Sequence, residues 1–201
     1  MRSAPLLCEM PKDAVPPDPP AALFAPQVRL DGSVDDDMLR RFREAMEAVE
    51  GQNGPIVVEL TTLGGDADIA RRMAIDIRLV RERTGRELLF LGKAVVYSAG
   101  LTVMAAFPPQ ARWLARGTSL LIHARSLTLT LNLDGPLAVE RRKLEAAMAQ
   151  IDEGLRLQAD GFAQLIAGSG VTLEELEALA AGAWYLDAEE ALARGLIAGV
   201  V

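Results

Sequence analysis

The stretch "PIVVELTTLGGDADIARRMAIDIRLVRER", residues 55–83, contains a buried strand, a glycine pair and an amphipathic helix in direct succession. Its first part is a run of β-branched and apolar residues of the kind that forms an interior strand of a parallel sheet. Gly64 and Gly65 then allow a tight backbone turn. The apolar residues that follow recur at helical spacing and predict one buried helix face: Ile69, Met73, Ile77 and Val80. The stretch therefore predicts a strand–turn–helix unit.

The same alternation continues on both sides of this unit. Strands are expected at 27–31, 87–97, 111–115, 118–124 and 183–186, and helices at 34–51, 98–107, 137–167, 172–180 and 188–195. Repeated strand–helix alternation favours right-handed crossovers and a mainly parallel sheet, so the predicted class is α/β. The segment 127–135 alternates in polarity and predicts either a strand or an extended loop. The helix at 137–167 is longer than a compact unit needs, and we expect it to project and pack against another subunit.

Composition limits the possible functions. The 201 residues suit one domain, which we place at 27–201 after a proline-rich arm at 1–26 that is expected to be extended or disordered. A net charge of −7 disfavours a nucleic-acid partner. With one cysteine, Cys8, and one histidine, we expect no disulfide within the chain and no metal site. No apolar run is long enough to span a membrane and no secretory signal is evident, so a cytoplasmic location is expected.

Ser98 stands where the strand in "GKAVVYSAGLTVMAAF", residues 92–107, gives way to a helix. A hydroxyl at this junction lies near the first free N–H groups of the helix, which favour a nucleophile that develops negative charge during attack. Serine is also a preferred N-cap residue. Position alone therefore leaves two interpretations open, a helix cap and a nucleophile.

Two further strand ends carry residues that suit the same chemistry. The N–H groups of Gly65 and Ala99 are candidates for an oxyanion hole, although a glycine pair is equally typical of a simple turn. His123 closes the apolar run "TSLLIH" and is the one side chain with an ordinary pKa suited to proton transfer near neutral pH. Because ligand sites of open α/β sheets form at the carboxyl ends of strands, these residues together predict a site.

Four segments resemble, in order and at similar spacing, the proteolytic subunit of the ATP-dependent Clp protease, within the ClpP/crotonase-like fold group. They are "IVVELTTLGGDADIARRMAI" (56–75), "GKAVVYSAGLTVMAA" (92–106), "GTSLLIHA" (117–124) and "LDAEEALARGLI" (186–197). The resemblance implies repeated ββα units and a long handle helix. It implies Ser98 as nucleophile, His123 as general base, and Gly65 and Ala99 as the oxyanion hole. It also implies polypeptide substrates, a homo-oligomeric ring, an ATPase unfoldase partner and no cofactor.

The chain departs from the family pattern at several positions. Counting back without gaps from "LDAEEA" puts Ala183 where the family has its catalytic aspartate. Asp187 is close in sequence and is a candidate third member, but with Glu190 it also forms a capping-box pattern for the last helix. The family's Gln-Pro after the histidine is replaced here by Ala124 and Arg125, followed by a less glycine-rich segment. Thr62-Leu63 replaces the family's Ser-Pro before the glycine pair.

The sequence thus favours a ClpP-like serine peptidase without its usual aspartate. The first alternative is a catalytically weak or silent subunit that serves as scaffold or regulator in an oligomer, and Ala183 motivates it. The second resembles the signal peptide peptidase A type, which pairs serine with lysine, and Lys143 is the one lysine placed downstream for that role. The third, an acyl-CoA enzyme of the same fold, needs no Ser98–His123 pair.

Overall fold

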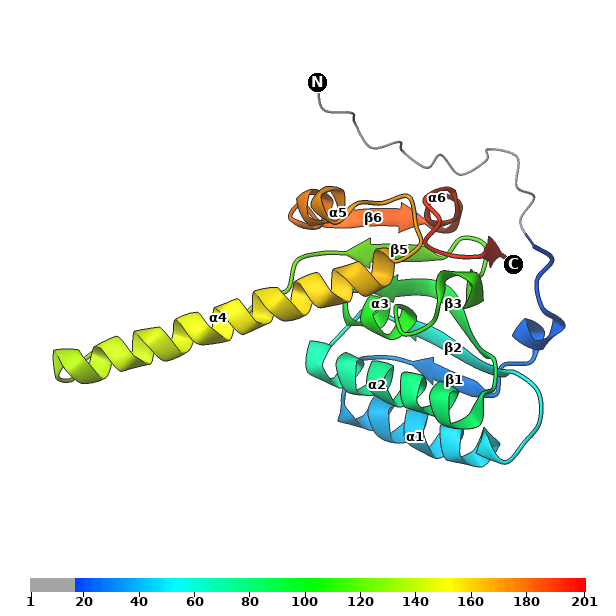
Figure 1. Ribbon diagram of the computed structural model, residues 1–201, viewed down its shortest axis with the longest axis horizontal. Coiled ribbons are helices and arrows are strands. Elements are labelled where there is room, and N and C mark those ends of the chain that lie inside the picture. The colour runs from blue at the N-terminus through cyan, green and yellow to red at the C-terminus, as the bar shows by residue number, and fades with distance from the viewer. Residues whose placement is uncertain (1–16) are drawn as a thin grey trace, which may run out of the picture.

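The computed structural model describes residues 17–201, which form a seven-stranded sheet with helices around it (Figure 1). The strands pair in the order β1-β2-β3-β4-β7, all parallel, and β5 pairs with β3 and antiparallel with β6. The α/β class and the mainly parallel sheet predicted from the sequence are confirmed. The strand bounds are β1 Val28–Asp31, β2 Ile56–Thr62, β3 Leu88–Tyr97, β4 Arg112–Leu114, β5 Ser119–Ile122, β6 Trp184–Asp187 and β7 Gly199–Val200.

Strand β3 serves two halves of the sheet. Its first part pairs with β4 at Phe90–Gly92, and its last part pairs with β5 at Val95–Tyr97. Between them the register against β2 shifts, and Ala94 has a φ of 57°, a left-handed conformation that is uncommon without glycine. The bend carries the carboxyl end of β3 to β5, so the residues that follow these two strands lie next to each other.

The helices lie around this sheet. In Figure 1, α1 and α2 lie side by side against β1 to β3, α6 lies near β6, and α4 projects far beyond the rest of the fold. Asp66 begins α2 by accepting hydrogen bonds from the N–H groups of Asp68 and Ile69, and Gly85 ends it with a φ of 64°. The bounds are α1 Asp36–Glu50, α2 Ala67–Thr84, α3 Ala99–Met104, α4 Leu137–Ile166, α5 Leu173–Ala180 and α6 Ala188–Ala193, with 3₁₀ turns η1 Ala21–Phe24 and η2 Pro109–Ala111.

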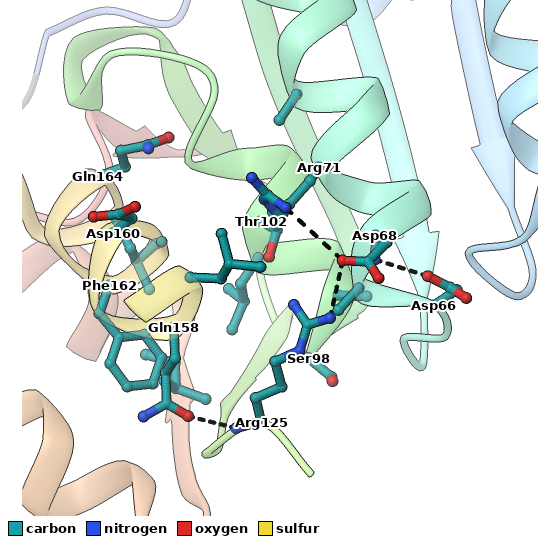
Figure 2. Close-up of a pocket in the computed structure, with 18 of the residues that line it drawn as sticks. Asp66, Asp68, Arg71, Ser98, Thr102, Arg125, Gln158, Asp160, Phe162 and Gln164 are labelled. Carbon is teal, nitrogen blue, oxygen red and sulfur yellow. Dashed lines mark hydrogen bonds and ion pairs between the residues drawn. The ribbon is translucent and has the colours of Figure 1, made fainter. Parts of the chain in front are cut away.

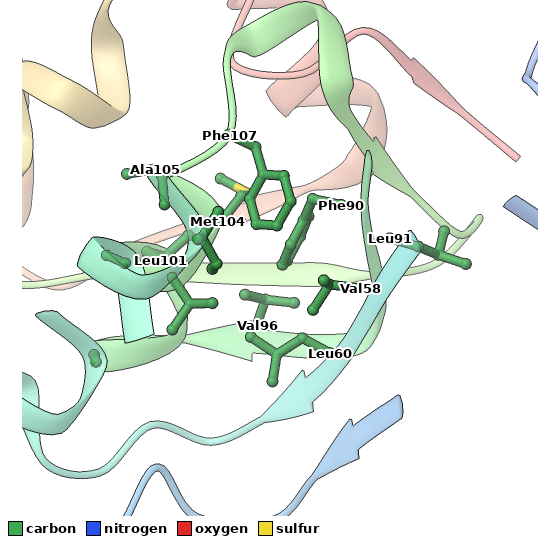
Figure 3. Packing of buried hydrophobic residues seen from close by; sticks show 14 of the residues in the cluster. Val58, Leu60, Phe90, Leu91, Val96, Leu101, Met104, Ala105 and Phe107 are labelled. Carbon is green, nitrogen blue, oxygen red and sulfur yellow. The ribbon is translucent and has the colours of Figure 1, made fainter. Parts of the chain in front are cut away.

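The short helix α3 is packed deep in the core, where Figure 3 shows Leu101 and Met104 against side chains of β2 and β3. Its small residues permit this position. A Cβ on Gly100 would lie 2.5 Å from Cγ2 of Thr62, so only glycine lets the start of α3 approach the end of β2 so closely. The ring centroids of Phe90 and Phe107 lie 5.5 Å apart behind the helix. This packing fixes the position of Ser98, the residue before α3.

The sequence alone did not settle the conformation of two segments. The alternating segment 127–135 forms no strand, and its four leucines are exposed along an extended loop: Leu127, Leu129, Leu131 and Leu133. Of the proline-rich arm expected at 1–26, residues 1–16 lie outside the described part of the chain. Residues 21–24 form η1, whose Leu23 is buried against the core.

Candidate active site

Ser98 adopts a strained conformation at the junction of β3 and α3. Its φ of 53° and ψ of −114° are rare for a residue with a side chain, and its N–H donates to the carbonyl of Leu121 at 2.9 Å. Its hydroxyl makes no capping hydrogen bond to α3. The helix-cap interpretation of Ser98 is therefore wrong, and the hydroxyl is left free to face the neighbouring cavity.

The glycine pair lies against Ser98. A Cβ on Gly64 would come within 2.9 Å of the Ser98 Cβ, and a Cβ on Gly65 would come within 2.4 Å of the Val34 carbonyl oxygen. Both glycines also have positive φ, at 107° and 149°. The buried hydroxyl of Thr62 accepts a hydrogen bond from the Gly64 N–H at 3.0 Å and so holds the turn. Only glycine at position 64 allows the turn to approach the serine this closely, and only glycine at position 65 allows it to approach Val34.

The backbone donors next to Ser98 are unoccupied. Within residues 17–201, no acceptor is recorded for the N–H groups of Gly65 and Ala99. Ala99 is the first residue of α3, so its N–H has no partner inside the helix. Two free donors at a strand–helix junction have the character of an oxyanion hole.

His123 follows the last residue of β5 and is partly exposed. Ile122 pairs with Trp184, so extending the antiparallel register by one residue puts His123 opposite Ala183. The N–H groups of Ala124 and Ala183 both donate to the carbonyl of Ala180, at 3.1 and 3.2 Å, so the two segments stay close although the strand ladder itself ends at Ile122 and Trp184. Ala183 thus lies close to His123, just beyond the end of the strand pair.

One cavity of about 430 Å³ brings together the four residues predicted from the sequence. It lies between the start of α2, the start of α3 and the last third of α4, and Figure 2 shows its polar residues. Among the described residues no hydrogen bond joins the Ser98 hydroxyl to the His123 ring. Such contacts are often long before substrate binds. The cavity is lined, among others, by Gly65, Ser98, Ala99, Leu101, Ile122, His123, Leu157 and Phe162.

Two other candidates lie elsewhere. Asp187 pairs with Ser119 at the far end of β5, four residues from His123 along the strand, or about 13 Å. Its carboxylate accepts the Glu190 N–H at 2.8 Å as the cap of α6, as the capping-box pattern indicated. Lys143 lies near the start of α4, bonded to the Asn132 carbonyl, and does not line the cavity. The structure brings neither residue to Ser98 or His123.

A polar bridge across the cavity was missed from the sequence (Figure 2). The guanidinium of Arg125 donates to the Asp68 carboxylate at 2.9 Å, and the backbone N–H of Arg125 donates to the Gln158 side chain at 2.6 Å. The bridge joins the segment after His123 to α2 and α4. Arg125 was visible as a departure from the family pattern, but no sequence signal pointed to Asp68 or Gln158, which lie far from it in the chain.

A buried arginine fixes the base of α4 next to the cavity. Arg112 is 1% exposed, and burial lowers its pKa to about 10, so it stays charged at neutral pH. Its guanidinium donates only to backbone carbonyls, which belong to Ala105, Phe107, Gln164, Leu165 and Leu196. The carbonyls at the end of α3 and the end of α4 are thereby tied to one cation, as suits the negative ends of helix dipoles.

Residues 17–201 contain no group of three or more His, Cys, Asp and Glu side chains placed to hold a metal ion. Within the same residues, no helix has the length and apolar character that crossing a membrane requires.

Comparison with known proteins shows likeness in structure and not in sequence. No protein-family model matches the chain, and no curated protein is similar to it in sequence. Among solved structures, a mutant of ClpP1 from Listeria monocytogenes superposes with a TM-score of 0.65, over 87% of this chain and 90% of that one, at 17% identity. This likeness shows that the chain has a ClpP-like fold.

Proposed function

We propose that the protein is a serine peptidase that hydrolyses peptide bonds with Ser98 as nucleophile and His123 as general base. The observation that carries the proposal is the strained, uncapped Ser98 in one cavity with His123 and two free backbone donors. Ser98 attacks the carbonyl carbon while His123 takes its proton and later gives it to the leaving amine. Gly65 and Ala99 hold the oxyanion through their N–H groups.

The shape of the neighbouring surface supports an extended polypeptide as substrate. A second cavity of about 520 Å³ adjoins the first and shares its Asp68, Arg125 and Gln158. It runs between residues 125–127 and the middle of α4, and its walls include Leu127, Ile151 and Leu155. A partly apolar cavity beside the one that Ser98 lines suits the side chains of an unfolded chain. Delivery of such chains by an ATPase unfoldase belongs to the same proposal.

Labelling with a fluorophosphonate tests the nucleophile. The native protein should form a stable adduct on Ser98, and Ser98→Ala should form none. His123→Ala should label more slowly by about 10²-fold or more, because a general base contributes that much to attack. Intact mass and peptide mapping check the site. Absence of labelling in the folded native protein, or equal labelling of Ser98→Ala, would overturn the proposal.

A silent subunit is the second candidate function. It is favoured by Ala183, whose methyl group cannot hold or charge-stabilise the nearby histidine. Such a subunit would keep the fold and its assembly surface while contributing no turnover. It predicts no labelling of Ser98 together with normal assembly, so the same labelling experiment, run beside a sizing measurement, separates the two functions.

The outer part of α4 supports assembly with further copies of the chain. Its exposed apolar residues outside the second cavity recur at spacings of seven and four, as along the seam of a coiled coil: Leu137, Leu144 and Met148. The exposed Leu129, Leu131 and Leu133, which also lie outside the second cavity, add to this surface. Contiguous apolar surface of this kind marks an interface. We infer that it joins copies of the chain, consistent with a ring-like oligomer.

Charges placed in this seam should break the assembly. We expect Leu144→Glu with Met148→Glu to give a smaller particle in sedimentation velocity, since an unpaired charge in an apolar interface is costly. Arg142→Ala, exposed on the opposite side of α4, is the matched control and should keep the native size. A native protein that already sediments as a monomer would contradict the inferred interface.

A further inference from the structure

The His123 ring has one recorded hydrogen bond within residues 17–201. Its Nδ1 lies 2.7 Å from the carbonyl oxygen of Ala124, the next residue in the chain. Ala183, which lies close to His123 just beyond the β5–β6 pair, offers no polar atom from its side chain. The partner of the ring is therefore a backbone carbonyl, at the nitrogen that a carboxylate contacts in a Ser-His-Asp triad.

The chemistry of this contact determines which tautomer the neutral ring adopts. A carbonyl oxygen only accepts hydrogen bonds, so Nδ1 must be the nitrogen that carries the hydrogen. Nε2 of the neutral ring then has the free lone pair that a general base needs. A carbonyl dipole also favours the imidazolium that forms during attack, although less than a full negative charge does. The contact thus selects the tautomer, as a triad carboxylate does, and partly stabilises the imidazolium.

The Ala124 carbonyl is useful only if its peptide is held still, and three bonds from three elements hold it. The Ala124 N–H donates to Ala180 at the end of α5. The Arg125 N–H, which belongs to the same peptide group as the Ala124 carbonyl, donates to Gln158 on α4, and the Arg125 guanidinium donates to Asp68 in the first turn of α2. Figure 2 shows both Arg125 bonds.

Residue 125 decides whether this arrangement is available. The family pattern has proline there, and proline has no N–H to give to Gln158 and no charge to give to Asp68. Exposed ion pairs stabilise proteins little, and Asp68 is exposed, so the Arg125–Asp68 pair contributes mainly geometry. Both departures from the family, Ala183 and Arg125, therefore concern the same imidazole.

We propose that Arg125, with Asp68 and Gln158, forms a latch that positions the Ala124 carbonyl as the orienting partner of His123. The latch residues are positioning residues, because they act on His123 through the Ala124 peptide. The inference rests on the proposed peptidase function for its catalytic meaning. The tautomer that it assigns to the ring is measured independently of activity.

Nuclear magnetic resonance of histidine labelled with nitrogen-15 tests the tautomer, and His123 is the single histidine of the chain, so its signals are unambiguous. In its neutral state, the native ring should be in the Nδ1–H form. Arg125→Ala and Gln158→Leu should shift the ring toward the Nε2–H form. Arg116→Ala, which removes a remote exposed ion pair, is the matched control and should match the native spectrum. A native ring in the Nε2–H form, or an unchanged ring in both latch variants, would overturn the proposal.

Kinetics then connect the latch to catalysis. Arg125→Ala should lower kcat by on the order of 10-fold to 100-fold with KM little changed, the scale of a small misplacement of a reacting group. In an Ala183→Asp background, Arg125→Ala should lower kcat by a much smaller factor, because the new carboxylate then holds the His123 ring. Equal losses in both backgrounds would overturn the latch. A protein that shows no fluorophosphonate labelling refutes the peptidase function, while the tautomer measurement still decides the latch.

Discussion

Replacing Ala183 with aspartate should raise kcat for peptide hydrolysis by up to about 10²-fold, less than the about 10⁴-fold that loss of a triad aspartate costs, because the Ala124 carbonyl already selects the tautomer of His123. Extending the β5–β6 register puts this position opposite His123, and side chains directly opposite have Cβ atoms about 5 Å apart. The backbone also accepts the change. Ala183 has a φ of 62°, and aspartate tolerates the left-handed region better than alanine. Steady-state hydrolysis of a fluorogenic peptide gives kcat.

Asp187→Asn provides the matched control for this gain. Asparagine caps helices as well as aspartate does, so α6 and stability should be preserved while a nearby carboxylate is lost. We expect kcat to stay at the native value. A loss of activity in Asp187→Asn would assign a catalytic part to Asp187 that its position does not support. An Ala183→Asp protein that folds but gains nothing would contradict the placement of His123 as the base.

Replacing Arg112 with methionine should lower the free energy of unfolding by about 3–5 kcal/mol, a large share of the stability of an ordinary domain. The side chain of methionine fills space but donates nothing, so five buried carbonyls lose their donor. Arg112→Lys keeps the charge but has fewer donors, all on one nitrogen. Its free energy of unfolding should therefore fall by less than that of Arg112→Met. Thermal and denaturant unfolding of both variants measure the effect.

Arg116→Met is the control for Arg112. Arg112 is the first residue of β4, and Arg116 follows that strand closely in the chain. Arg116 is exposed, however, and so is its partner Glu189. Its replacement should change stability by about 1 kcal/mol or less. If Arg112→Met unfolded at the native midpoint with an unchanged denaturant slope, the buried cation would not be holding α3, α4 and the chain near Leu196 together.

The fold was predictable because its signals are local. The run from Ile56 to Thr62 and the helical spacing of Ile69, Met73 and Ile77 each fix one element, and those side chains are buried as expected. The segment 127–135 was ambiguous because alternating polarity needs a neighbouring strand to become a sheet, and none of the described strands pairs with it. The bend at Ala94 carries no sequence signal, because alanine does not favour the left-handed conformation that it adopts there.

The candidate site was predictable only where the chain gives residues at strand ends. Gly65, Ser98, Ala99 and His123 each follow a strand, and parallel strands bring their ends together. The latch depends on Asp68 and Gln158, which reach Arg125 from two helices that no spacing rule connects. The partner of the His123 ring is the backbone carbonyl of residue 124. Every residue type has this carbonyl, so the sequence could not predict the contact.

The length of α4 also makes it a mechanical lever. Its 30 residues span about 45 Å, and Arg112 pins it at Gln164 and Leu165. Leu157, on the cavity wall, is about 12 Å from that pivot, whereas the tip at Leu137 is about 42 Å from it. A rigid swing that moves the tip by about 3 Å moves the wall by slightly less than 1 Å. The lever thus reduces tip movements to the scale on which reacting groups lose or gain alignment.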